Sequence, residues 1–142
     1  MLPSQQNKYL EASVQTATPA QLLIMLCDGA IRFCKMGIES TKKGNFEDAN
    51  KNLFKVQDIV KEFMITLEPN SPISEGLFQL YEYFILKLVE ANTKKVSAPA
   101  EEVLGYLLEL KETWFQAAKI TNAAHHAQTP AYVAGAGVVK HG

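Results

Sequence analysis

The sequence predicts an all-α fold, an antiparallel up-down four-helix bundle with a short N-terminal segment packing on it and a flexible C-terminal tail. Apolar residues recur every three to four positions along most of residues 18–120, the spacing that gives an α-helix an apolar face. Short breaks containing Pro or Gly divide this stretch into four segments of roughly 20 residues. Four such helices joined by short links pack most simply as a bundle.

The first predicted helix begins at Thr18, where several N-terminal signals coincide. Thr18 suits the N-cap position, Pro19 suits the first helical position, and Gln21 completes a capping-box pattern. The helix should end near Lys42, because Gly44 can adopt the left-handed conformation that closes a helix. Residues 1–17, ahead of this start, are polar and mixed.

The second and third predicted helices are also bounded by capping residues and prolines. Asn45 is a good N-cap for the second helix, and Pro69 stops it. For the third, Ser71 followed by Pro72 repeats the pattern of an N-cap with proline at the first helical position. The third helix is expected to end at Lys95, since positive charge suits a helix C-terminus.

The fourth predicted helix follows Ser97 and Pro99 and ends near Ile120. Beyond it, residues 123–128 could extend the helix, but Pro130 and the Gly-rich end of residues 121–142 predict a flexible tail. The chain thus divides into an N-terminal segment 1–17, a bundle 18–120 and a tail 121–142. No internal repeat or second domain is expected.

Composition excludes several classes of function. With 142 residues and a formal net charge of −1, the chain fits one domain and lacks the basic surface that nucleic acid or an anionic membrane requires. The sequence contains no run of 18 apolar residues, so we expect no segment that spans a membrane. The start shows no secretory signal. Cys27 and Cys34 would lie roughly 10 Å apart along a helix, too far for a disulfide, so we expect core thiols in a cytoplasmic protein.

Catalytic and metal-binding patterns are weak, so we expect neither an enzyme nor a cofactor. The adjacent His125 and His126 would point about 100° apart on a helix, whereas a shared metal favours spacing by one turn. Asp28 and Arg32, four residues apart, suggest an exposed ion pair rather than a catalytic pair. A small phosphotransfer or metal bundle stays open as an alternative function, as does a self-associating structural bundle.

The first predicted helix is more apolar than one buried face requires. Its charged residues crowd one narrow sector, and the remaining arc of roughly 260° is apolar or small, against the ~100° that a surface helix needs. Either the helix is sheltered on several sides by its own chain, or part of this surface awaits a partner. Surplus apolar stripes recur on three helices and make the candidate partner-binding residues Ile24, Ile31 and Ile38; Phe54 and Ile65; and Leu104, Leu108 and Phe115.

Residues 1–17 form a candidate lid over such a groove. Their few large apolar side chains include Tyr9, Leu10 and Val14, which give an otherwise polar segment a small apolar face. An open apolar groove risks aggregation, so a covering segment with Tyr9 as its main anchor is expected between partners.

Several motifs resemble those of the flagellar secretion chaperones, the family known as FliS. The resemblance covers roughly residues 5–120 and includes Tyr9 placed ahead of Val14 in the N-terminal segment. Cys27 departs from the family pattern, which has Tyr there. The motifs are Thr16-Ala17-Thr18-Pro19, Met25-Leu26-Cys27-Asp28-Gly29-Ala30-Ile31-Arg32-Phe33, Gln57-Asp58-Ile59-Val60, Leu80-Tyr81-Glu82-Tyr83 and Leu110-Lys111-Glu112-Thr113-Trp114.

This resemblance implies a function and a set of partners. Members of the family are antiparallel helical bundles that hold the disordered C-terminal segment of flagellin, which wraps the bundle largely as helices. They prevent flagellin from polymerising in the cytoplasm and help present it to a component of the type III export gate. The resemblance also implies that the N-terminal segment packs over the groove and moves when flagellin binds. When free, the chain is expected to be a monomer or a weak dimer.

Overall fold

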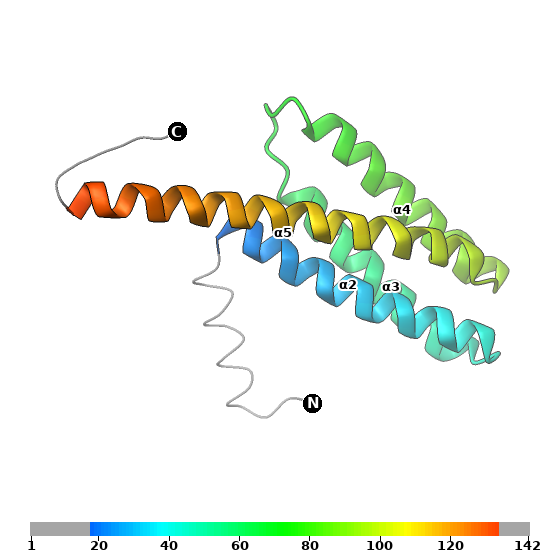
Figure 1. Cartoon of the computed structure of the whole chain (residues 1–142). Coiled ribbons are helices and arrows are strands. Elements are labelled where there is room, and N and C mark those ends of the chain that lie inside the picture. Colours follow the sequence, from blue (N-terminus) through cyan, green and yellow to red (C-terminus); the bar gives the residue numbers. More distant parts are fainter. Residues whose placement is uncertain (1–17, 134–142) are drawn as a thin grey trace, which may run out of the picture. The chain divides into compact units, whose positions relative to one another are not determined.

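The structure is a computed structural model that describes the backbone of residues 18–133 and the side chains of residues 18–120. It contains four helices, α2 (Pro19–Lys42), α3 (Phe46–Ile65), α4 (Ser74–Lys94) and α5 (Ala98–Val133) (Figure 1). The described residues contain no β-strand, so the prediction of an all-α fold is confirmed. The candidate lid, with Tyr9, Leu10 and Val14, lies outside the described residues.

Helix α2 begins and ends with the predicted signals. The backbone N–H of Gln21 donates to Thr18 Oγ1 at 3.1 Å, and the backbone N–H of Thr18 donates to Gln21 Oε1 at 3.0 Å, which is a complete capping box. At the other end, Gly44 has φ +78°, and the backbone N–H of Asn45 reaches the carbonyl of Ser40 at 2.8 Å. This bond, from the residue after the left-handed one, is characteristic of a Schellman motif.

The start of α3 agrees with the prediction, whereas the start of α4 does not. Asn45 caps α3, accepting a bond from the backbone N–H of Asp48 at 3.2 Å. Helix α4 begins at Ser74, without a side-chain cap, rather than after Ser71. The backbone N–H of Ser71 donates to the carbonyl of Glu68 at 3.2 Å, so Ser71 belongs to a turn of the linker instead.

Helix α5 also differs from the expectation, since it continues to Val133 and passes the expected end at Ile120. Residues 121–129 include three alanines, the residue with the highest helix propensity. Proline at position 130 removes one backbone donor without ending the helix. The backbone of residues 121–133 in the predicted tail thus continues α5, residues 134–142 lie outside the described residues, and the flexibility of the tail stays a prediction.

The chain divides into two compact units. One is Met25–Lys111, and the other consists of Met1–Ile24 with Glu112–Gly142. The first unit contains most of α2, all of α3 and α4, and the first part of α5. The second contains the start of α2 and the remainder of α5.

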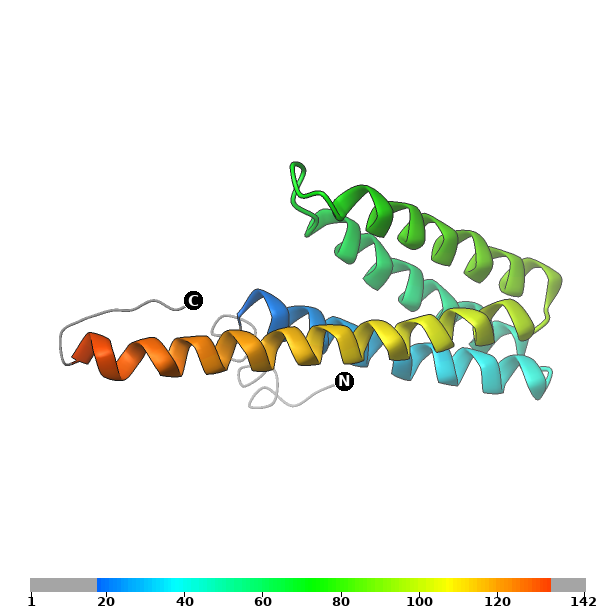
Figure 2. The same ribbon diagram turned by 45° about the horizontal axis from the view of Figure 1, so that its top comes forward.

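Four helical segments surround one core in the unit Met25–Lys111, which confirms the predicted bundle. Within it α3 and α4 run side by side in opposite directions (Figures 1 and 2). The rings of Phe63 and Tyr81 stack across this pair at 5.3 Å between centroids, and at its other end Asn92 Nδ2 donates to Asn50 Oδ1 at 2.5 Å. All four helices supply fully buried side chains, the largest being Tyr81, Phe63, Phe84, Leu53, Leu88, Leu107, Val56, Val60, Val103, Cys27 and Cys34.

Helices α2 and α3 approach closely at a glycine. A Cβ atom added to Gly37 would lie 2.8 Å from Leu53 Cδ2 and 3.0 Å from Leu53 Cγ. These distances are shorter than van der Waals contact, so the small residue allows the two helices to meet at this point.

Candidate partner-binding surface

Polar contacts fix how α2 lies against α5 within the unit Met25–Lys111. Asp28 Oδ1 pairs with Lys111 Nζ at 2.6 Å, and Lys42 Nζ pairs with Glu101 Oε2 at 3.4 Å. These contacts join the earlier part of α2 to the later residues of α5, and the end of α2 to the start of α5. The two helices are therefore antiparallel here.

The first of these ion pairs corrects an expectation from the sequence. Asp28 was expected to pair with Arg32, one turn away on the same helix, but its partner is Lys111 of α5. The Arg32 guanidinium lies over the ring of Phe33, 5.0 Å from its centroid. Spacing along one helix does not show a partner that a neighbouring helix brings closer.

Helix α5 carries two apolar stripes of different exposure. Val103 and Leu107 are fully buried. Leu104, one residue further round the helix, is half-buried, and Leu108 is 46% exposed. The predicted second stripe, Leu104, Leu108 and Phe115, is thus distinct from the core, and Phe115, in the other unit, is also 46% exposed.

The predicted stripe on α2 is mostly core. Ile31 and Ile38 are each only 8% exposed, so these two candidates lie on no open surface, which corrects the expectation. The nearby Cys34 thiol contacts the carbonyl of Ala100 at 3.4 Å, which shows that α5 covers this side of α2. Ile24 is half-buried.

The stripe on α3 is open. Phe54 is 50% exposed and Ile65 is 74% exposed. Sequence reasoning missed other exposed apolar side chains, among them Met36 at 45% and Leu86 at 63%. On the helix surface Leu86 lies between Glu82 and Glu90, four residues away on either side, and this setting is the sequence signal that its side chain faces solvent.

The unit that contains the start of α2 holds an apolar cavity beside the chain's one tryptophan. The cavity has a volume of about 360 Å³ and is lined by Thr18, Pro19, Ala20, Leu23, Trp114 and Ala117. Trp114 Nε1 is buried and has no hydrogen-bond partner among the side chains and backbone of residues 18–120. Buried donors almost always find an acceptor, so this N–H is suited to an acceptor supplied by a bound molecule.

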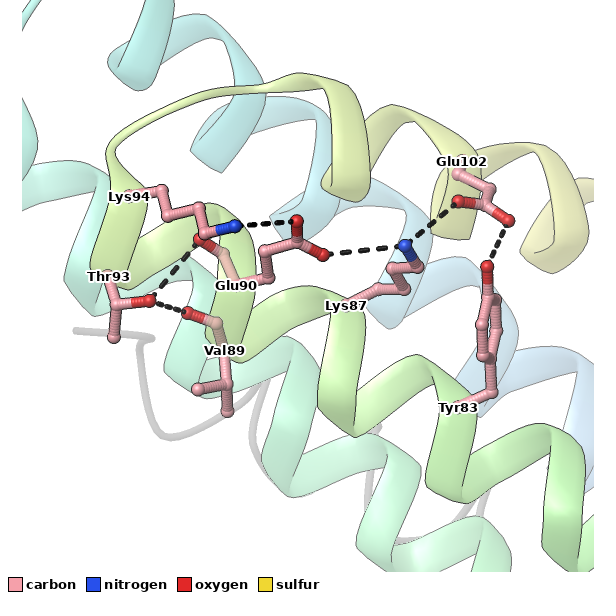
Figure 3. A network of polar contacts seen from close by, with 7 residues as sticks. All are labelled: Tyr83, Lys87, Val89, Glu90, Thr93, Lys94 and Glu102. Carbon is pink, nitrogen blue, oxygen red and sulfur yellow. Dashed lines mark hydrogen bonds and ion pairs between the residues drawn. The ribbon is translucent and has the colours of Figure 1, made fainter.

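A polar network covers the flank between α4 and α5 (Figure 3). Glu102 accepts a 2.5 Å hydrogen bond from the Tyr83 hydroxyl and lies 3.9 Å from Lys87 Nζ. Glu90 pairs with Lys87 and with Lys94, each at 3.4 Å. The hydrogen bond from Lys87 lowers the pKa of Glu90, and the one to Glu102 raises the pKa of Tyr83. These groups satisfy one another, so this flank is poorly suited to an apolar partner.

The buried cysteines are not activated nucleophiles. Burial raises the pKa of Cys27 and of Cys34 from 9.0 to about 12, so both are neutral thiols near pH 7. In the described part of the chain no three His, Cys, Asp or Glu side chains gather as metal ligands. None of the helices described here is long and apolar enough to cross a membrane.

Comparison with known proteins identifies the family. Residues 1–121 match the family described as "Flagellar protein FliS". The chain belongs to the FliS family. The flagellar secretion chaperone FliS of Bacillus subtilis (strain 168) is 33% identical over 118 residues, which cover 83% of this chain and 89% of that protein. The flagellar secretion chaperone FliS of Salmonella typhimurium (strain LT2) is 30% identical over 110 residues, or 75% of this chain and 82% of that one. The flagellar secretion chaperone FliS of Vibrio cholerae is 26% identical over 109 residues, which cover 75% of this chain and 80% of that protein.

The family assignment confirms the resemblance found in the sequence and supports a role as an export chaperone. It also agrees with the geometry. An all-helical bundle that keeps apolar side chains half-exposed on α5 and α3 is a suitable receptor for amphipathic helices.

Proposed function

We propose that this chain is a cytoplasmic export chaperone, not an enzyme, that binds the disordered C-terminal segment of flagellin in apolar grooves. Binding would keep flagellin from polymerising prematurely and hold it ready for the gate of the flagellar type III export apparatus. The observation that carries the proposal is the second apolar stripe of α5, where Leu108 stays 46% exposed beside the fully buried Leu107.

The recognition would be of the helix-in-groove type, in which an amphipathic segment folds as it lays its apolar face against the bundle. Leu104, Leu108 and Phe54 would supply apolar contacts on the unit Met25–Lys111, and Phe115 would supply one on the other unit. Trp114 Nε1, which has no acceptor in the part of the chain that the structure describes, would donate to a carbonyl or amide oxygen of the segment. Coupled folding of this kind buries on the order of 1,000–3,000 Å², and ordering the segment offsets part of the gain.

The N-terminal segment is proposed as the lid of this surface, a proposal that rests on its sequence and on the family resemblance. Tyr9, Leu10 and Val14 would cover the apolar groove and leave when flagellin binds. A lid competes with the cargo, so its docking free energy is subtracted from the observed binding. Three modest anchors must offset the ordering of the segment, so the lid is weakly held.

Calorimetry with the C-terminal segment of the cognate flagellin tests the proposal. We expect a one-to-one complex, no turnover of the segment, and a negative heat-capacity change because apolar surface is buried. A peptide of the same composition in scrambled order is the control, since scrambling removes the amphipathic pattern. If the native segment binds no better than the scrambled one, the proposed function is wrong.

A self-associating structural bundle is the second candidate, and the number of exposed large apolar side chains favours testing it. Light scattering of the purified chain, alone and with the flagellin segment, separates the two. The proposed chaperone is a monomer or weak dimer that forms a one-to-one complex. A structural bundle would be a stable oligomer that the segment does not alter.

A further inference from the structure

The end of the bundle where α3 passes into α4 contains a cavity that the proposed cargo surface does not use. Its volume is about 460 Å³, within the range of roughly 300–1,000 Å³ typical of sites that bind small ligands or side chains. Met64, Leu67 and Phe78 form an apolar wall, and Glu68 and Glu75 also line the cavity. All of these residues belong to the unit Met25–Lys111.

The linker that shapes the cavity is held by hydrogen bonds and prolines. The carbonyl of Glu68 accepts from the backbone N–H of Ser71 at 3.2 Å and from the Ser74 hydroxyl at 2.5 Å. Pro69 and Pro72, both in the lining, restrict the backbone further. The cavity therefore exists before any partner arrives, which reduces the ordering cost of binding.

Several large apolar side chains are exposed in and beside the linker. Phe78, which lines the cavity, is 42% exposed, and Ile73, the last residue of the linker, is 62% exposed. Ile65, the last residue of α3, is 74% exposed. Large apolar side chains that are exposed together on a protein surface typically mark a place of contact with another molecule.

The charged side chains near the α3–α4 linker are all negative. Between Lys61 and Lys87 the chain carries no Lys or Arg, but it has four glutamates, Glu62, Glu68, Glu75 and Glu82. Within the part of the chain that the structure describes, neither Glu68 nor Glu75 forms an ion pair. A partner that matches this surface carries positive charge next to apolar side chains.

We propose that the α3–α4 end is a second docking site, which takes a basic amphipathic helix of another protein. An apolar side chain of that helix would enter the cavity against Met64, Leu67 and Phe78. Its Lys or Arg residues would pair with Glu68 and Glu75 at the rim. The residues of this site differ from Leu104, Leu108, Phe54 and Phe115 of the proposed flagellin surface, so we expect both partners to bind at once.

The first test uses a helical peptide of roughly 14 residues built from Leu and Lys, about four turns long, and a matched peptide with Glu in place of Lys. Backbone NMR shifts of the full chain map where each one binds. We expect the Leu/Lys peptide to shift residues 64–78, with an affinity that falls as salt is raised. The Leu/Glu peptide should not bind. Equal binding of both peptides, or shifts centred elsewhere, would overturn the proposal.

Variants test which residues form the site. Glu68→Gln with Glu75→Gln should weaken binding of the Leu/Lys peptide about three- to thirtyfold, because two exposed ion pairs of about 0.3–1 kcal/mol each are lost. Phe78→Ala should weaken it by a similar factor. Matched controls at the other end of α3 are Glu47→Gln and Phe46→Ala, the latter residue being 38% exposed. If the controls weaken binding as much as the site variants, the proposed site is wrong.

A final arm separates this proposal from the flagellin proposal. The peptide is titrated into the free chain and into the chain saturated with the flagellin segment. If the peptide's affinities for the free chain and for the flagellin-saturated chain agree within about twofold, the two sites are independent. A twofold difference is far smaller than the tenfold change that 1.4 kcal/mol of coupling would cause. Loss of peptide binding would place the α3–α4 end in the cargo surface and overturn a second site. The arm on the free chain decides the proposal even if flagellin does not bind.

Discussion

The α3–α4 interface and the outer stripe of α5 use similar side chains for different purposes. Across the interface, Phe63 and Tyr81 stack with 0% and 1% of their surface exposed. On the stripe, Leu108 and Phe115 are both 46% exposed. Buried apolar area stabilises the fold whether or not a partner is present. Half-exposed apolar area contributes most when a partner covers it, so stability and binding should respond to different substitutions.

The largest expected effect is on the interface. Phe63→Ala should lower the free energy of unfolding by about 3–5 kcal/mol, because it removes a fully buried ring and leaves a cavity. Phe54→Ala, on the same helix but 50% exposed, should cost less than about 1 kcal/mol. Urea unfolding measures both. Similar losses for the two variants would remove the distinction between core and surface on α3.

A smaller effect is expected where α2 meets α3. Gly37→Ala places a Cβ atom 2.8 Å from Leu53 Cδ2, and overpacking of this kind costs about 1–3 kcal/mol. The matched control is Gly105→Ala on α5, where a Cβ atom would meet nothing within 4 Å. That change should stabilise by up to ~1 kcal/mol through helix propensity. If both variants gain stability, the close approach of α2 and α3 does not require glycine at position 37.

The buried ionisable groups give a pH dependence. Burial raises the pKa of Cys27 and of Cys34 to about 12, so the folded chain keeps protons that the unfolded chain loses near pH 9. Stability is fully present below pH 9 and falls as the pH rises toward 12. The loss should be about 1.4 kcal/mol per thiol by pH 10. Unfolding by urea at pH 8 and pH 10 measures it, and an unchanged stability would contradict the burial of the thiols.

The sequence predicted those parts of the molecule that local chemistry determines. The capping box of Thr18 and Gln21, the left-handed Gly44 and the cap at Asn45 each depend on residues a few positions apart. The second stripe on α5 also followed from helical spacing, because Leu104 and Leu108 fall on a different arc from Val103 and Leu107. These features require no knowledge of the neighbouring helices.

The parts that were not predicted depend on tertiary contacts. The spacing of Ile31 and Ile38 shows which face of α2 they share but not that α5 covers it. The pairing of Asp28 with Lys111 has the same origin. Ser71 carried a good capping signal, yet a turn of the linker uses its backbone instead. The cavity beside Phe78 depends on how that linker closes, which no periodicity in the sequence encodes.

The most direct test of this account is the substitution Leu108→Lys, with stability and flagellin binding measured on the same protein. Val96→Lys is the matched control, since Val96 lies in the α4–α5 linker and is 44% exposed. We expect the free energy of unfolding of both variants to lie within about 1 kcal/mol of that of the unsubstituted chain. Only Leu108→Lys should weaken binding of the flagellin C-terminal segment, by about tenfold or more, because a buried leucine is worth about 1.5–3 kcal/mol. Binding of the segment at unchanged affinity by a folded Leu108→Lys variant would contradict the account.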